Sequence, residues 1–288
     1  MTKKIDIHLH LRPETYQDDT GRLISSAKEM LPHLKELGIE KGIILPTGKN
    51  CGNGLCSNED ARAIHEQYPE YYAYMCNYDE TEPEDVYATL EQHKQNGAVG
   101  IGELTINRRI DDPLLEAIFE AAGKLRMPIT FHMSPETGYS YGIVDKPGLP
   151  LLEKALMKYP QTVFMAHSPT FWIEISKDAP TEKEERNAWG QGPVIPGGRV
   201  VTLFETYQNL YGDLSANSAG QAIMRDPEFG LDFLEKFADR LFFATDMLNT
   251  GMVFPLGAWL DEMYKIGKLS ESAYKKIVRE NALRLYFQ

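Results

Sequence analysis

Six side chains that commonly bind metal ions occur along the chain, each at the end of an apolar run. Two of them, His8 and His10, belong to residues 4–11, where apolar and polar residues alternate as in a β-strand. Side chains two apart on a strand point to the same face, so the two imidazoles project together and can share an ion. The other candidates follow later apolar runs: Glu103, His132, His167 and Asp246. Together these residues predict a metal site.

Each candidate taken alone has an ordinary structural explanation. Glu103 could cap a helix or pair with Arg108, and Asp246 could begin a helix. His132 and His167 could be core histidines bonded to backbone carbonyl groups. Six nitrogen and oxygen ligands at equivalent positions are hard to produce by chance, and this favours metal binding. The remaining histidines are expected to have surface or packing roles: His33, His65 and His93.

The type and number of ions stay open at this point. Imidazole and carboxylate ligands suit Zn²⁺ best here, and also Mn²⁺, Fe²⁺ or Ni²⁺. Six ligands exceed what one tetrahedral zinc needs, so two ions can be accommodated. With two ions, Glu103 would bridge them, His8, His10 and Asp246 would hold one, and His132 and His167 the other. With one ion, the ligands would be His8, His10, His132 and Asp246, and His167 would polarise or protonate the substrate.

The chemistry expected of such a site is hydrolysis. A divalent ion lowers the pKa of bound water from ~15.7 towards ~7. Asp246 would accept the proton of that water as general base and pass it to the leaving group. His167 or the second ion would polarise the scissile carbonyl. An ester, lactone, amide or related bond of a small molecule fits this chemistry.

Eight short apolar segments alternate with helical segments along the chain. The predicted strands are residues 4–11, 41–46, 71–78, 98–104, 128–132, 162–167, 210–214 and 241–246. The predicted helices are residues 23–37, 58–68, 84–96, 113–125, 149–159, 200–209, 218–237, 254–266 and 270–285. This alternation predicts an α/β fold, a (β/α)8 TIM barrel forming one domain over residues 1–288. A doubly wound open sheet is the alternative, but no Gly-rich phosphate loop follows the first strand.

The region after the sixth predicted strand breaks this rhythm. Residues 168–198 are rich in Pro, Gly and charge, and we interpret them as a lid-like insertion. Aromatic residues of this loop and of an earlier one could form an apolar wall for a ring-bearing ligand. Cationic residues in two loops could bind a substrate carboxylate or phosphate. The substrate-binding candidates are Arg12, Lys49, Tyr139 and Trp172, with Tyr141 and Trp189 as further aromatic residues.

Composition excludes several classes of partner. The net charge is −12 and no Lys/Arg-rich run occurs, which argues against nucleic acids and anionic membrane surfaces. No apolar stretch approaches the ~18 residues of a membrane span, and no signal-peptide pattern is found. The three cysteines, Cys51, Cys56 and Cys76, form no disulfide framework and suit a reducing compartment. We therefore expect a cytoplasmic protein whose partner is a small-molecule substrate; a homo-oligomer is possible by analogy only.

The same residues resemble the amidohydrolase superfamily over residues 5–285. The matching motifs are Asp6-Ile7-His8-Leu9-His10, Phe131-His132, Met165-Ala166-His167 and Ala244-Thr245-Asp246. Tyr211-Gly212-Asp213-Leu214-Ser215 and Asn281-Ala282-Leu283-Arg284-Leu285 are similar to the amidohydrolase-related branch, which includes aminocarboxymuconate-semialdehyde decarboxylase-like enzymes. The resemblance implies a metal-dependent enzyme.

One motif departs from that branch and bears on the reaction. Gly100-Ile101-Gly102-Glu103 resembles the strand-four glutamate of TatD-like relatives, whereas the decarboxylases typically have no ligand there. This favours a binuclear hydrolase. The alternative is a mononuclear decarboxylase or lyase acting on an aryl or unsaturated carboxylate. A non-catalytic metal-binding protein would not need both Asp246 and His167.

Overall fold

The strands that position the candidate ligands are parallel and belong to two sheets. The computed structural model describes residues 2–18, 21–47, 55–78 and 85–287. One sheet has the order β1 (Lys4–Leu9), β4 (Ile39–Ile44) and β5 (Tyr72–Tyr74). The other has the order β12 (Leu241–Phe242), β11 (Leu210–Asp213), β10 (Phe164–Ala166), β7 (Ile129–Phe131) and β6 (Ile101–Leu104). The predicted α/β fold with parallel strands is confirmed.

Backbone hydrogen bonds connect the two sheets at both of their edges. Beside β1, Leu9 bridges to Met247, and the amide of Asp246 donates to the carbonyl of His8 at 2.9 Å. Beside β5, Cys76 bridges to Ile101 and accepts from the amide of Gly102 at 2.7 Å. The strand ends that carry the candidate ligands are thereby held next to one another.

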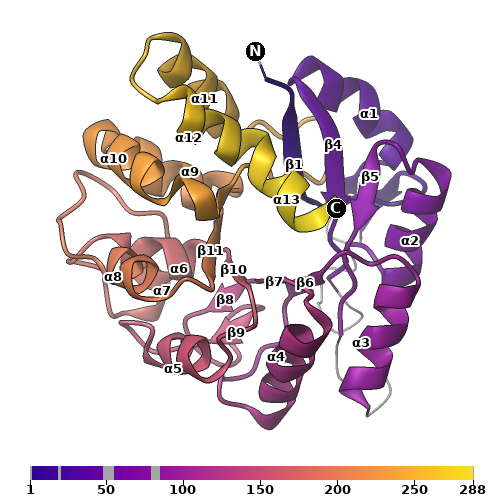
Figure 1. Cartoon of the computed structure of the whole chain (residues 1–288), viewed down its shortest axis with the longest axis horizontal. Helices are drawn as coiled ribbons and strands as arrows, with labels where there is room; N and C mark the ends of the chain where they lie inside the picture. The colour runs from indigo at the N-terminus through magenta and orange to yellow at the C-terminus, as the bar shows by residue number, and fades with distance from the viewer. Residues whose placement is uncertain (1, 19–20, 48–54, 79–84, 288) are drawn as a thin grey trace.

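Helices surround the strands (Figure 1). The helices of eight or more residues are α1 (Ala27–Glu36), α2 (Asn58–Gln67), α3 (Val86–Gln95), α4 (Pro113–Leu125), α5 (Pro150–Lys158), α8 (Arg199–Thr206), α9 (Ala216–Met224), α10 (Pro227–Phe237) and α11 (Leu256–Lys265). The chain ends with α12 (Glu271–Lys275), the π-helical η3 (Lys276–Glu280) and α13 (Asn281–Tyr286). No helix in the described ranges is long and apolar enough to cross a membrane.

Two predicted helices differ from the structure in ways that local chemistry explains. Residues 23–37 do not form one helix: β3 (Leu23–Ile24) pairs with β2 (Tyr16–Gln17), and α1 begins only after Ser26, which caps it. The predicted helix over residues 218–237 is two helices. Asp226 caps α10 and Pro227 is its first residue, so the chain turns between α9 and α10.

Residues 168–198 contain short helices rather than an extended loop. They include α6 (Pro169–Trp172), the 3₁₀-helix η1 (Ile173–Ile175) and α7 (Lys183–Arg186). Another short pair of strands, β8 (Met133–Ser134) and β9 (Ile143–Val144), follows β7. A further 3₁₀-helix, η2 (Ala238–Arg240), precedes β12.

The apolar core has two parts. The larger cluster contains apolar residues of the strands and of the surrounding helices, among them Ile118, Phe119 and Phe204. The smaller cluster joins residues of β1, β4, β5, β10 and β12 to Ala282 and Tyr286 of α13. The C-terminal helix therefore packs on the strands themselves, and Figure 1 shows it crossing them.

Candidate metal centre

The structure brings all six predicted ligands together. His8 lies on β1 and Glu103 on β6. His10, His132 and His167 directly follow β1, β7 and β10, respectively, and Asp246 comes shortly after β12. The five other side chains are almost fully buried, whereas the Asp246 side chain is 26% exposed. Asp246 is therefore the candidate ligand that solvent or a substrate can reach most readily.

Hydrogen bonds fix the orientation of the first two imidazoles. His8 Nδ1 lies 2.6 Å from Asp213 Oδ2, and His10 Nδ1 lies 2.7 Å from the carbonyl oxygen of Leu45. Both partners can only accept, so each Nδ1 carries a proton and each Nε2 presents a lone pair when the ring is neutral. The two Nε2 atoms are 3.0 Å apart, a spacing suited to two ligands of one ion, which would lie about 3–3.4 Å apart.

Each of the two carboxylates extends one oxygen towards the first histidine pair and the other towards His167. Glu103 Oε2 lies 3.4 Å from His10 Nε2 and 3.8 Å from His8 Nε2, whereas Oε1 lies 3.8 Å from His167 Nε2. Asp246 Oδ1 lies 3.2 Å from His10 Nε2, and Oδ2 lies 3.8 Å from His167 Nε2. Both carboxylates therefore span the space between the two groups of histidines.

His132 and His167 are held differently from the first pair. His167 Nδ1 lies 2.8 Å from the hydroxyl of Ser215. His132 Nδ1 is buried and has no hydrogen-bond partner among the residues that the structure describes. The Tyr141 ring lies against His132 with ring centroids 4.2 Å apart, and Gly142 is so close that an added Cβ would lie 2.9 Å from His132 Nδ1. Packing, rather than a hydrogen bond, orients this ring.

Burial and neighbouring charges together raise the pKa of some residues in the cluster and lower the pKa of others. Burial opposes protonation of His10, but Asp246 and Glu103 outweigh it and raise the pKa of His10 to about 9. Burial disfavours the Glu103 carboxylate, but His10 and His8 outweigh it and lower the pKa of Glu103. Burial lowers the pKa of His132 to about 4. The cluster thus combines ionised carboxylates with one histidine that stays neutral.

The donor set fits divalent metal ions. His8, His10 and Glu103 offer ligand atoms within 4.8 Å of one another, and so do Glu103, His132 and His167. The two groups share Glu103. Imidazole nitrogens with carboxylate oxygens are the ligands of zinc and of several first-row transition metals.

Backbone geometry and a buried aspartate place Asp246. Asp246 has a φ of 63°, in the left-handed region, directly after Thr245. Asp6 on β1 accepts hydrogen bonds from the Thr245 amide at 3.0 Å and the Thr245 hydroxyl at 2.6 Å. The strand that carries His8 therefore also holds the segment that carries Asp246.

The substrate-binding candidates lie in different surroundings. Trp172 is not part of a loop wall: it lies in α6, is 1% exposed, and packs against Phe171 and Phe233. That prediction of its position is wrong because residues 169–172 form a helix whose aromatic residues enter the core. Arg12 lies over the Tyr16 ring and 3.6 Å from Asp60, and Tyr139 is 38% exposed beside Lys183. Lys49 and Cys51 lie outside the described residues.

Three residues of the site were not among the predicted site residues: Asp6, Asp213 and Ser215. Asp213 and Ser215 orient His8 and His167, and Asp6 holds Thr245. The sequence does indicate Asp213 as a site residue, because Asp213 ends an apolar run in the same way as the predicted ligands do. Nothing in the sequence indicates that the Ser215 hydroxyl reaches His167, 48 residues earlier.

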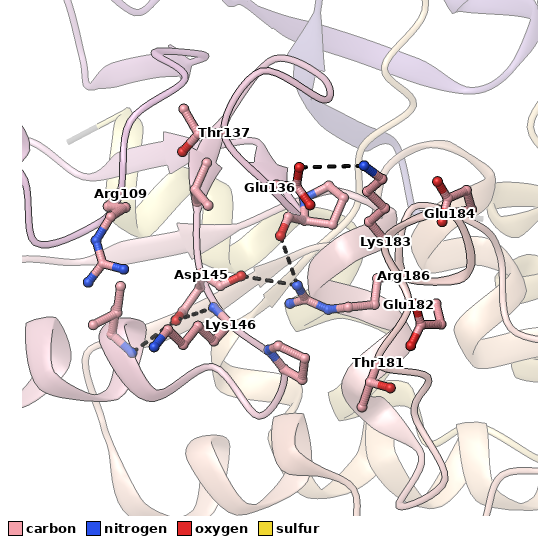
Figure 2. Close-up of a pocket in the computed structure, with 14 residues that line it drawn as sticks. Arg109, Glu136, Thr137, Asp145, Lys146, Thr181, Glu182, Lys183, Glu184 and Arg186 are labelled. Atoms are coloured by element: carbon pink, nitrogen blue, oxygen red, sulfur yellow. Dashed lines mark hydrogen bonds and ion pairs between the residues drawn. The ribbon is translucent and has the colours of Figure 1, made fainter.

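A cavity of about 590 Å³ lies beside the segment that follows His132 (Figure 2). Its lining includes Arg186 of α7, whose Nη1 donates to the carbonyl oxygens of Pro135 at 3.1 Å and Asp145 at 3.0 Å. Lys183 of the same helix lies 3.4 Å from Glu136. These contacts connect residues 168–198 to the segment that contains Tyr141.

Comparison with known proteins identifies the family. A family model described as amidohydrolase matches residues 5–288. The chain belongs to the amidohydrolase family. It is therefore an enzyme of the amidohydrolase superfamily, and the buried histidine and carboxylate cluster agrees with a metal-dependent member. A search of curated protein sequences finds no significant match.

Solved structures of other amidohydrolases share the fold along the whole chain. A dihydroxybenzoic acid decarboxylase from Polaromonas, with bound manganese and 2-nitroresorcinol, has a TM-score of 0.63 and 19% identity, covering 99% of this chain and 97% of that chain. A 2,6-dihydroxybenzoate decarboxylase from Rhizobium has a TM-score of 0.61 and 16% identity, with coverages of 99% and 98%. A probable 2-pyrone-4,6-dicarboxylic acid hydrolase from Acinetobacter baumannii has a TM-score of 0.59 and 14% identity, covering 100% of both chains. At these identities the likeness concerns the fold, and the two reactions remain alternatives for this amidohydrolase.

Proposed function

We propose that this amidohydrolase is a hydrolase with two divalent metal ions, most suitably Zn²⁺, that cleaves an ester, lactone, amide or related bond of a small molecule. We further propose that the eight parallel strands form a closed (β/α)8 barrel in a single domain over residues 1–288, with residues 168–198 as a lid over the site. The backbone bonds at both edges of the two sheets support the closed barrel.

The binuclear proposal rests on the different directions in which the two carboxylate oxygens of Glu103 point. Glu103 directs Oε2 to the His8 and His10 pair and Oε1 to His167. A carboxylate between two groups of histidines is placed to bridge two cations. His8, His10 and Asp246 would hold one ion, and His132 and His167 the other.

The residues of the chain have distinct tasks in this proposal. Bound ions would supply Lewis acidity, which acidifies a water molecule and polarises a carbonyl group. Asp246 is the general base, because its side chain is the most exposed of the six. Nearby imidazoles outweigh its burial and lower the pKa of its carboxyl, so that it is ionised at neutral pH, the form a general base needs. His167 faces both carboxylates and is placed to stabilise charge on the substrate oxygen.

The second candidate function is a mononuclear decarboxylase acting on an aryl or unsaturated carboxylate. Two neighbours of this fold are named as decarboxylases of dihydroxybenzoates. In that case the ion would be held by His8, His10, His132 and Asp246, and Glu103 would not be needed as a bridge.

Metal content distinguishes the two functions. Protein prepared without chelator or added metal is analysed for metal, as wild type, as Glu103→Ala and as the control Glu136→Ala, whose carboxylate is exposed and outside the site. We expect about two ions per chain in wild type and in the control, and one or none in Glu103→Ala. One ion in all three proteins would overturn the binuclear proposal. Turnover of ester or lactone substrates rather than aryl carboxylates would support hydrolysis.

A further inference from the structure

The histidines of the site differ in the chemistry of the group that faces Nδ1. His8 faces the carboxylate of Asp213, and His10 faces a backbone carbonyl oxygen; both can only accept. His167 faces the hydroxyl of Ser215 at 2.8 Å. A hydroxyl can donate or accept, so it is compatible with a proton on either ring nitrogen of His167.

Ser215 uses its hydroxyl in an unusual way for its position. It is the N-cap residue of α9, where a serine hydroxyl normally accepts from the backbone of the first turn, yet its side chain makes no capping bond. Ser26, Ser57 and Ser270 precede α1, α2 and α12 and do cap their helices. The hydroxyl of Ser215 is directed to His167 instead.

The neighbouring carboxylate is too distant to replace this contact. Asp213 Oδ2 lies 3.9 Å from His167 Nδ1, beyond hydrogen-bond distance, while it lies 2.6 Å from His8 Nδ1. The Ser215 amide donates to Asp213 Oδ1 at 2.9 Å, which fixes the short segment between them. The short segment from Asp213, the last residue of β11, to Ser215 thus orients His8 with a carboxylate and His167 with a hydroxyl.

We propose that Ser215 is a positioning residue that makes His167 the exchangeable ligand of the site. When the hydroxyl accepts from Nδ1–H, Nε2 is free to bind the second ion; when the hydroxyl donates to Nδ1, Nε2 carries the proton and faces Glu103 and Asp246. His8 and His10 each face an acceptor at Nδ1, so a neutral ring carries its proton on Nδ1 in both cases. This inference rests on the proposed binuclear site. It predicts that the affinity for the second ion depends on Ser215, whereas the affinity for the first ion does not.

The first test compares stepwise zinc affinities, measured by competition with a chromogenic chelator. The variants are Ser215→Ala and the control Ser218→Ala. Ser218 is also buried near the start of α9, but its hydroxyl donates to the carbonyl of Ser215 and forms no hydrogen bond with a histidine that the structure describes. In Ser215→Ala we expect the second ion to bind about 10–100-fold more weakly and the first to change less than about twofold. Ser218→Ala should leave both ions unchanged. Equal weakening of both ions, or of neither, would overturn the proposal.

The second test reads the proton directly and does not depend on the second ion. Ring ¹⁵N chemical shifts of His167 are recorded with one equivalent of zinc. We expect wild type and Ser218→Ala to show an average of both tautomers, and Ser215→Ala to shift to the Nε2–H form, because two carboxylates lie 3.8 Å from Nε2 and attract its proton electrostatically, against the single carboxylate 3.9 Å from Nδ1. Unchanged shifts in Ser215→Ala would overturn the proposal. If wild type binds a single ion, the binuclear function fails, and these shifts still decide the role of Ser215.

Discussion

Asp213 Oδ2 lies 2.6 Å from His8 Nδ1, and both side chains are fully buried. The carboxylate fixes the ring so that Nε2 points to the site, next to His10 Nε2. Groups that bond to a metal-binding histidine in this way typically account for 10–100-fold in metal affinity.

We therefore expect Asp213→Asn to weaken binding of the first ion by about 10–100-fold, because the amide lacks the negative charge and accepts from Nδ1–H less strongly. Chelator competition measures the change. Asp239→Asn is the control, since Asp239 pairs with Lys276 at an exposed position. Equal affinities in Asp213→Asn and the control would contradict the role of Asp213.

Metal binding should become tighter as pH rises towards 9. Burial opposes protonation of His10, but Asp246 and Glu103 raise its pKa to about 9, so the metal-free protein holds this proton at pH 7. Burial opposes protonation of His8 as well, but Asp213 and Asp246 outweigh it and raise the pKa of His8. An incoming ion must displace both protons, so its affinity should rise about 100-fold per pH unit below pH 9 while two protons are released. Calorimetric titrations of chelator-treated protein in buffers of different ionisation enthalpy count the released protons. A pH-independent affinity would show that His8 and His10 are already neutral before the ion binds.

Trp172 should contribute to stability through packing. It is 1% exposed, and its indole N–H donates to the carbonyl oxygen of Asp213 at 3.2 Å. Trp172→Ala should lower the free energy of unfolding by about 3–5 kcal/mol, and Trp172→Phe should lower it by less. Trp189→Phe is the control, because Trp189 is 50% exposed, and should change stability by less than about 0.5 kcal/mol. Urea unfolding measures all three, and a small effect of Trp172→Ala would contradict the buried position.

Arg186 should hold the segment after His132 in place. Its Nη1 donates to the carbonyl oxygens of Pro135 and Asp145 (Figure 2), and its Nη2 lies 3.9 Å from Glu174. Arg186→Ala would leave buried carbonyl groups unpaired, at a cost of about 1–3 kcal/mol each. We expect faster amide hydrogen exchange over residues 135–145 and 174–186. Lys183→Ala removes a half-exposed ion pair and a contact with the exposed Tyr139 ring, no buried bond, and should change exchange far less; the same exchange rates in both variants would argue against the role of Arg186.

The sequence by itself determined which residues could be ligands. His8, His10, Glu103, His132, His167 and Asp246 each follow or end an apolar run, and the parallel order of these runs places their carboxyl ends together whatever the details of the loops. Local signals also fixed α4, whose predicted and observed bounds agree, since Asp112 caps it and Pro113 begins it. The apolar periodicity continues across Ser26 and Asp226, so it does not predict that new helices begin directly after these two capping residues.

Only the tertiary structure decided what each ligand can do. Asp213 reaches His8 across 205 positions of sequence and Ser215 reaches His167 across 48, so neither pair leaves a local pattern. The direction of each Glu103 oxygen and the burial of Trp172 depend likewise on how distant strands and helices pack. The tautomer of an imidazole is set by the group facing its other nitrogen, and that group is supplied by the fold.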